Sequence, residues 1–290
     1  MYPIINRFLA LFLLVATAAA QTAGSTAKPA ASVEDENARK ARALIDKTIE
    51  SLGGQAYLTF QEKTQDGRYY TFHHGESNSA GTPFGLLTKY PDKDRLEIIH
   101  LRNYHILWWT VGNVPIKDKN DVVVIYNGDK GYEITYKGTR ALDANELADY
   151  LRRRRHSLDW VLRKWLAEPG VALFYEGPTV AEQKAVEQVT ITNSRNETVT
   201  LFIDANTHLP VKKTFSWRDP TDKQRNVEDE VYDKYRAVQG IMTPFSVTRY
   251  YNGDMSYQRF LNSVTYNSGL SDSLFEASVR YDPNKPAPRK

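Results

Sequence analysis

From residue 55 onward, apolar and polar side chains alternate along most of the chain with a period of two residues. This alternation is typical of β-strands with one buried face, because successive side chains point to opposite sides of a sheet. Asn127-Gly128 and Asn252-Gly253 separate pairs of these segments and predict tight hairpins, and Asp66-Gly67 predicts a further turn. The predicted strands are 57–63, 67–74, 84–90, 95–101, 105–111, 122–126, 132–136, 171–175, 186–193, 197–203, 209–217, 228–237, 241–251 and 255–266.

Two segments instead repeat apolar residues at intervals of three and four, as one face of an amphipathic helix does. The first runs from Glu34 to Leu52, with acidic residues in its first turn and Gly53-Gly54 after its end. The second runs from Glu146 to Ala167, follows a capping segment at 143–145 and ends at Pro169-Gly170.

Strands joined mostly by hairpin-length connections, together with two helices, favour an α+β fold with a single antiparallel sheet. No linker composition interrupts the chain between Gly53 and Arg280. We therefore expect one folded domain over residues 34–281.

The first 20 residues have the composition of a cleavable secretory signal peptide. Arg7 precedes the small and apolar run Phe8–Ala20, and Ala18-Ala19-Ala20 fits the small-x-small cleavage pattern. An uncleaved membrane anchor is the disfavoured alternative, since the run is about a dozen residues and a spanning helix needs roughly 20. We expect residues 1–20 to be removed, residues 21–33 to form a disordered spacer and residues 282–290 to form a disordered tail.

The chain contains no cysteine, which excludes disulfides, thiolate metal sites, a cysteine nucleophile and a lipid-modified N-terminal cysteine. An exported, disulfide-free chain of this size is expected to be soluble in a bacterial periplasm. The 38 Lys and Arg residues nearly balance the 35 Asp and Glu residues, giving a net charge of +3. Bulk charge therefore does not indicate a nucleic-acid partner.

The order of motifs along the chain is distinctive. A helix ending in Leu52-Gly53-Gly54 precedes a strand at 84–90 and Pro91. Later motifs, in order, are a strand at 197–204, Thr207-His-Leu-Pro-Val-Lys212, Tyr232-Asp-Lys-Tyr-Arg236, Val238-Gln-Gly-Ile-Met-Thr-Pro244, a hairpin and Asp272-Ser-Leu-Phe275. In this order and spacing the chain resembles the outer-membrane lipoprotein-sorting superfamily, the LolA-, LolB- and LppX-like proteins, over Glu34–Val279.

The resemblance implies an unclosed half β-barrel of about 11 antiparallel strands. Helices would cover its concave face over a hydrophobic cavity that takes acyl chains of lipids or lipoproteins. General carriers of this family place an arginine directly before the proline that ends the early strand, where it helps to hold the helical lid. This chain departs from the carriers, because Tyr90 stands at that position, preceded by Lys89.

Seven residues are predicted to form the wall and lid of the cavity, because their spacing places them on apolar faces of strands or of the second helix. They are Phe84, Leu86, Ile98, Trp108, Leu151, Leu158 and Val161. For Trp108, ordinary packing within the sheet is an equal alternative.

The strongest charge cluster is a run of four arginines in the middle of the second predicted helix: Arg152, Arg153, Arg154 and Arg155. Four consecutive helical residues point in different directions, so they do not form one face. They are candidates for contact with anionic lipid headgroups or a membrane surface. The simpler interpretation is a solvated outer face of the lid helix.

No catalytic group, metal site or cofactor is predicted. His73 and His74 are adjacent on a predicted strand, so we expect their side chains on opposite faces. His100 and His105 flank a turn but lack a defined third metal ligand. Neither a Gly-x-Ser-x-Gly nucleophile elbow nor a glycine-rich phosphate loop occurs in the sequence.

The sequence thus leads to two hypotheses. The first is a periplasmic carrier or chaperone that binds a lipid or lipoprotein acyl chain without catalysis. A monomer is expected, with an inner- or outer-membrane receptor as a candidate partner. The second is a periplasmic sensor or scaffold that uses the half barrel as a protein-interaction module, with edge strands and the arginine-rich helix as its contact surface. A hydrolase is a distant third.

Overall fold

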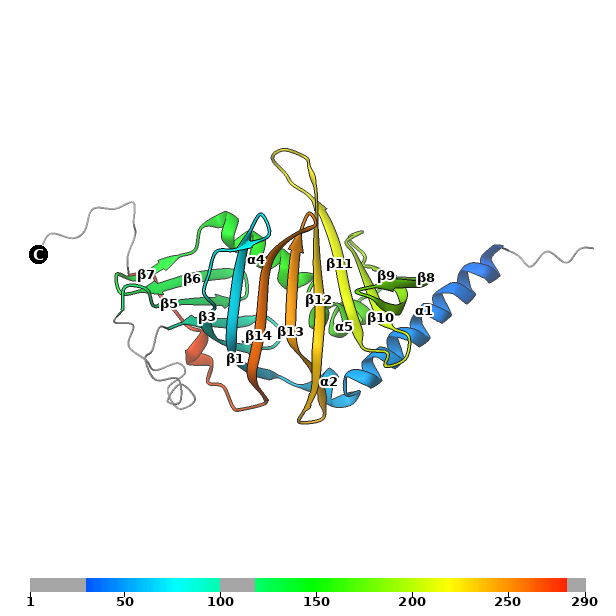
Figure 1. The fold of residues 1–290 in the computed structure, drawn as a ribbon, viewed down its shortest axis with the longest axis horizontal. Helices are drawn as coiled ribbons and strands as arrows, with labels where there is room; N and C mark the ends of the chain where they lie inside the picture. The colour runs from blue at the N-terminus through cyan, green and yellow to red at the C-terminus, as the bar shows by residue number, and fades with distance from the viewer. Residues whose placement is uncertain (1–29, 100–117, 281–290) are drawn as a thin grey trace, which may run out of the picture.

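The computed structural model describes residues 30–99 and 118–280, and all fourteen strands within them belong to one antiparallel sheet (Figure 1). The strands are β1 (Glu62–His73), β2 (Glu76–Ser77), β3 (Thr82–Lys89), β4 (Lys93–Ile98), β5 (Val122–Asn127), β6 (Lys130–Thr135), β7 (Gly138–Ala141), β8 (Ala172–Ala181), β9 (Lys184–Thr192), β10 (Thr198–Asp204), β11 (Pro210–Arg218), β12 (Arg225–Val238), β13 (Ile241–Tyr251) and β14 (Asp254–Tyr266). The helices are α1 (Ala30–Leu52), α2 (Gln55–Thr59), α4 (Ala144–Arg155) and α5 (Leu158–Arg163), with short 3₁₀ turns η2 (Trp165–Ala167) and η3 (Asp272–Phe275). The predicted class, α+β with one open, curved antiparallel sheet, is confirmed, although the sheet has more strands than the predicted number of about 11.

The strand order makes β7 and β8 the two edges of the sheet. The order is β7-β6-β5-β4-β3-β1-β14-β13-β12-β11-β10-β9-β8, and β2 pairs with β1. The first and last long strands therefore pair near the middle of the sheet, with Lys63 opposite Tyr266 and Thr71 opposite Tyr257. Because β7 and β8 are consecutive in the chain but lie at opposite edges, the segment between them has to cross the sheet. This crossing contains α4 and α5, which lie behind the strands in Figure 1.

The main hydrophobic core lies between helices α1, α2 and α5 and the face of the sheet toward them, which we call the inner face. Its helical part includes Ala41, Leu44, Ile45, Leu52, Tyr57, Val161 and Leu162, and its strand part includes Val189, Ile191, Val199, Leu201, Ile203, Phe215 and Phe245. The strand residues recur at every second position, as the alternation predicted. On the other face, Phe275 of η3 packs against Leu87, Val123 and Ile125.

The structure corrects two predictions near the start of the sheet and shifts one helix boundary. α1 begins at Ala30, four residues before the predicted start at Glu34 and inside the predicted spacer. Tyr57, predicted to open a strand, lies in α2, where it is buried in the main core, so tertiary packing overrides its strand preference. Asp66-Gly67, predicted as a turn, is a β-bulge within the single long strand β1.

The second predicted helix, 146–167, is broken in two and ends in a 3₁₀ turn. α4 ends at Arg155, and the chain restarts as α5 at Leu158. Ser157 caps the new helix, because its Oγ accepts a hydrogen bond from the Trp160 backbone N–H at 3.3 Å. The apolar repeat continues through this break, so the repeat alone does not reveal it.

Gly67 lies at the point of closest approach between β1 and β14. A Cβ atom at this position would meet the carbonyl oxygen of Phe260 at 2.1 Å. Only glycine allows this approach, and the bulge at Asp66-Gly67 bends the strand at the same point.

We expect Gly67→Ala to lower the free energy of unfolding by about 1–3 kcal/mol, because backbone atoms of β14 would have to move to admit the methyl group. Gly85→Ala is the control, since its Cβ would make only ordinary contacts with Glu97 at 3.9 Å. Urea unfolding followed by circular dichroism measures both. Equal stability of Gly67→Ala and the parent protein would contradict the close approach of the two strands.

Candidate functional site

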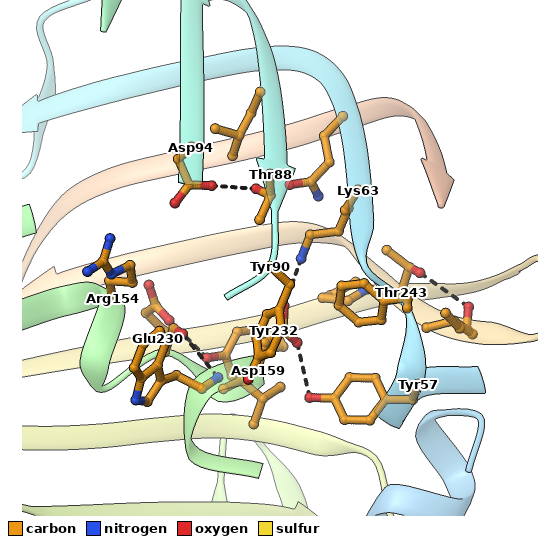
Figure 2. Close-up of a pocket in the computed structure, with 18 of the residues that line it drawn as sticks. Tyr57, Lys63, Thr88, Tyr90, Asp94, Arg154, Asp159, Glu230, Tyr232 and Thr243 are labelled. Carbon is orange, nitrogen blue, oxygen red and sulfur yellow. Dashed lines mark hydrogen bonds and ion pairs between the residues drawn. The ribbon is translucent and has the colours of Figure 1, made fainter. Parts of the chain in front are cut away.

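A cavity of about 270 Å³ lies between the inner face of the sheet and the crossing formed by α4 and α5 (Figure 2). Its wall takes residues from β1, β3, β4, β12, β13 and β14, from α1 and α2, and from both helices of the crossing. The volume is close to the lower end of the roughly 300–1,000 Å³ that small-molecule sites occupy. This cavity is our candidate ligand-binding site.

Part of the lining is apolar and aromatic. Phe60 packs against Tyr57, Tyr90 and Tyr266, with ring centroids 6.1, 6.4 and 5.0 Å away. The remaining apolar residues of the lining include Leu52, Leu86, Leu158, Trp160, Ile241 and Met242.

The rest of the lining is charged. It contains eight charged residues: Lys63, Asp94, Arg153, Arg154, Asp159, Glu230, Arg249 and Arg259. The cavity is therefore amphipathic, whereas the resemblance implied a hydrophobic one. Figure 2 shows that sheet and crossing both contribute charged groups, with Asp159 and Arg154 on the crossing and Lys63, Asp94 and Glu230 on strands.

Asp159 holds the start of α5 against the sheet. Its two carboxylate oxygens accept hydrogen bonds from Lys63 Nζ at 2.8 Å and from the Tyr57 hydroxyl at 3.0 Å (Figure 2). Burial acts to raise the pKa of Asp159, but the Lys63 ammonium, together with Arg163 and the Tyr57 hydroxyl, holds the pKa below its usual value. The carboxylate thus stays ionised and fastens helix, strand and α2 together.

Glu230 is the centre of a charged row across three neighbouring strands. It lies opposite Lys213 on β11 and Arg249 on β13. Its carboxylate contacts Lys213 Nζ at 2.9 Å and Arg249 at 3.2 Å, and it accepts a hydrogen bond from the Tyr232 hydroxyl at 2.9 Å. Burial acts to raise the pKa of Glu230, but these two cations lower it far below its ordinary value.

Lys213 also reaches the break in the crossing. Its side chain is only 1% exposed, and its Nζ donates a hydrogen bond to the His156 carbonyl oxygen at 2.7 Å. His156 is the C-cap residue of α4. The charged row therefore fixes the place where α4 ends, since a cation favours the negative end of a helix dipole.

Asp94 connects α4 to the other half of the sheet. It accepts a hydrogen bond from Thr88 Oγ1 at 2.5 Å and another from the Tyr150 hydroxyl of α4. The Tyr150 ring stacks on Tyr126 of β5 at a centroid distance of 3.3 Å. Burial raises the pKa of Asp94, although the two hydroxyls act to lower it.

Arg163 of α5 packs against Tyr90, the residue at which the chain departs from the sorting carriers. Its guanidinium lies 3.6 Å from the Tyr90 ring and donates a hydrogen bond to the Phe60 carbonyl oxygen at 2.6 Å. Burial raises the pKa of Tyr90 to about 12, while Arg163 acts to lower it. The cation at this contact thus comes from the crossing and not from the strand.

The four predicted headgroup arginines belong to one helix turn but have different environments. Arg152 lies 4.0 Å from the Trp217 ring and pairs with Asp149. Arg154 donates a hydrogen bond to the Asp92 carbonyl oxygen at 3.0 Å and lines the cavity, Arg155 lies 3.7 Å from Glu197, and Arg153 lines the cavity. None of the four residues is fully exposed, so a solvated outer face does not describe them.

The seven predicted wall and lid residues lie in different places. Leu86 and Leu158 line the cavity, whereas Phe84 and Val161 are buried in the main core outside its lining. Ile98 on β4 and Leu151 on α4 are half-buried and do not line it. Trp108 lies outside the described residues.

The charged half of the site carries a signal in the sequence that the apolar repeat alone does not show. Along β11, Lys213 occupies an inward position between the buried residues Val211 and Phe215. Arg249 likewise follows the buried Val247 at the inward spacing on β13. A charge at a position that the alternation assigns to the core requires a partner there. Lys213 and Arg249, with Glu230 on the strand between them, therefore predict a buried network.

The histidine pair differs from the prediction, and no metal site arises from it. The rings of His73 and His74 lie 4.2 Å apart instead of on opposite faces, because β1 ends at His73 and His74 has a positive φ of 50°. In the described part of the chain, no group of three His, Asp or Glu side chains is arranged to hold a metal ion. Nor does a helix within those residues have the length and apolar composition to cross a membrane.

The fold defines the class of protein that the chain resembles. A DUF1329 family protein from Desulfovibrio piger matches with a TM-score of 0.53 at 13% identity, over 81% of this chain and 97% of that one. A domain assigned to the outer membrane lipoprotein-sorting proteins, from Vibrio parahaemolyticus, matches with a TM-score of 0.50 at 10% identity, over 82% and 97%. The chain thus shares its fold with both of these proteins, as the resemblance to the lipoprotein-sorting proteins predicted. No protein-family model and no curated protein sequence matches the chain significantly.

We expect Glu230→Gln to lower the free energy of unfolding at pH 7 by about 3 kcal/mol, because Lys213 would stay buried without its counter-charge. The pKa of Glu230 is lower in the folded protein than in the unfolded chain. Its contribution to stability is therefore complete when the pH is above the unfolded-state pKa, and it is lost as the pH falls toward the folded-state pKa. The difference between variant and parent should therefore shrink below about pH 4.3. Urea unfolding at pH 7 and at lower pH measures it.

Asp233→Asn is the matched control for this experiment. Asp233 is 59% exposed and lies 3.8 Å from Lys184, so its loss should change stability by less than about 1 kcal/mol. A Glu230→Gln difference that does not vary with pH would contradict the ionised state of Glu230.

Proposed function

We propose that this protein is an extracytoplasmic carrier that binds a lipid or lipoprotein acyl chain in the cavity beneath α4 and α5. The observation that carries the proposal is the cavity itself, which has an aromatic wall around Phe60 and is covered by the crossing. The fold that it shares with a domain assigned to lipoprotein sorting supports the same role.

The proposal places the protein in the bacterial periplasm. Residues 1–20, which have the composition of a signal peptide, would direct its export. An acyl chain crossing the periplasm needs an apolar cover, because its exposure to water is unfavourable in proportion to its apolar area. A carrier with an internal cavity supplies that cover.

We propose binding without chemistry. The three carboxylates of the lining already have partners, with Asp159 on Lys63, Glu230 on Lys213 and Arg249, and Asp94 on two hydroxyls. Such a network holds the crossing in place. A general base has to be able to approach a substrate proton, and these groups are occupied by structural contacts.

A protein-interaction module is the second candidate, and the edge strand β8 is the observation that favours it. Phe174 and Val180 on this strand are 42% and 73% exposed. The Asn37 side chain occupies part of the edge through hydrogen bonds of 2.8 and 2.9 Å with the Tyr175 backbone. The arginine-rich turn offers less to a partner than the sequence indicated, because three of its four side chains contact residues of the same chain.

We expect the mature protein to carry lipid when it is extracted for mass spectrometry and to take up a fluorescent fatty acid. Leu86→Trp should weaken uptake about tenfold, because the indole would fill part of the cavity. Val180→Trp is the control, since its side chain lies on the exposed edge strand. Absence of both bound lipid and uptake in the parent protein would contradict the carrier.

A further inference from the structure

Two arginines that line the cavity, Arg153 and Arg259, have no hydrogen bond or ion pair with any described residue, and both are half-buried. The Nε of Arg259 is buried without a hydrogen-bond acceptor. Partial removal of a guanidinium from water without a hydrogen-bond acceptor in contact with it costs free energy. The two side chains thus face the cavity with unused hydrogen-bonding capacity.

The rest of the lining does not balance these charges. Its five cationic residues face three carboxylates, and each carboxylate already has partners of its own. Arg249, for example, is engaged by Glu230 at 3.2 Å and Glu228 at 3.4 Å. The excess positive charge of the cavity is therefore located at Arg153 and Arg259.

These two arginines lie at the same part of the cavity. Arg259 lies on β14, paired with Tyr69 of β1 on one side and with Val247 of β13 on the other. Arg249 lies two residues beyond Val247 on β13, so the two arginines are diagonal neighbours on adjacent strands. Arg153 approaches the same row from α4, where burial and the positive charge of Arg249 lower its pKa, although the carboxylates of Glu228 and Asp149 act to raise it. The sheet and the crossing thus present cations to one region.

This cationic region lies between an apolar end and a second cavity. Ile241 lines the apolar end and precedes Arg249 by eight residues on β13, which corresponds to roughly 26 Å along the strand. In the other direction, Arg153 and Arg249 also line a neighbouring cavity of about 300 Å³ beside Trp217 and Tyr251. The carboxylates of Asp149, Asp219 and Glu228 line this second cavity as well. The site is elongated, with apolar residues at one end, the guanidinium groups of Arg153 and Arg259 beyond them, and a second cavity of mixed charge at the far end.

We propose that Arg153 and Arg259 bind the anionic headgroup, a carboxylate or a phosphate, of a single-chain amphiphile whose chain occupies the apolar end. The inference rests on the proposed carrier function and specifies its ligand class. Guanidinium groups match carboxylate and phosphate oxygens in geometry and form charge-assisted hydrogen bonds with them. An anionic headgroup would thus supply the directly bonded acceptors that the described residues do not provide to these two guanidinium groups.

Calorimetric titration of the full mature protein at pH 8 tests the proposal with four probes. Tetradecanoic acid and 1-tetradecanol share one chain and differ in headgroup charge, a monoacyl glycerol phosphate carries a phosphate headgroup, and inorganic phosphate is the free anion. We expect the two anionic amphiphiles to bind at least about tenfold more tightly than the alcohol, and inorganic phosphate to bind far more weakly. The double variant Arg153→Gln/Arg259→Gln should bind acid and alcohol equally.

The controls separate this inference from a structural effect and from failure of the carrier. The double variant should unfold at the temperature of the parent or above it, because no ion pair is lost. Arg225→Gln removes an exposed cation elsewhere on the sheet and should keep the preference for the acid.

Equal binding of acid and alcohol by the parent protein, or a preference that survives the double substitution, would overturn the inference and leave the carrier intact. If inorganic phosphate binds as tightly as the amphiphiles, the acyl chain contributes nothing to binding and the inference fails. If no amphiphile binds, the carrier proposal fails with it.

Discussion

The site depends on one topological constraint, which is that β7 and β8 follow each other in the chain but form opposite edges of the sheet. A connection between them has to run across the sheet, and α4 and α5 lie within it. Backbone polar groups that leave water need hydrogen bonds, and helices provide them internally. The cover of the cavity is therefore not an added domain or a loop of free length. It is the required connection between the two edges, and its position follows from the strand order.

The crossing is held by charged and polar contacts as well as by apolar packing. Lys63 reaches Asp159 at the start of α5, and Lys213 reaches the His156 carbonyl oxygen at the end of α4. Buried ion pairs add little net stability, because desolvation offsets the attraction, yet breaking one leaves an uncompensated charge. Such contacts therefore define position more than they add stability. Glu230 can hold two cations at once because strand register places Lys213 and Arg249 directly on either side of it.

The fold was largely accessible from the sequence, and the site only in part. Hairpins such as the one at Asn252-Gly253 are local, and both residues have the positive φ that a tight turn needs. The pairing of β1 with β14 joins segments about 200 residues apart in the chain, and no local pattern encodes it. The break at Ser157 was missed because the apolar repeat continues across it. The charged half of the cavity does not follow from the apolar repeat, because Lys213 and Arg249 occupy inward positions that the repeat assigns to the core.

An amphipathic lining also changes what the ligand-free protein requires. A purely apolar cavity stays dry and is costly to keep open, since its walls lose packing contacts. A cavity with several polar partners for each water molecule can be hydrated. Arg153 and Arg259 can therefore be solvated when no ligand is present, which lowers the cost of keeping the cavity open. When an amphiphile enters, its chain displaces water from the aromatic wall around Phe60, and its headgroup takes the place of water at the guanidinium groups. A simple acyl-chain pocket would lack these charges. Here they allow the cavity to stay open without its ligand and give the bound ligand a fixed orientation.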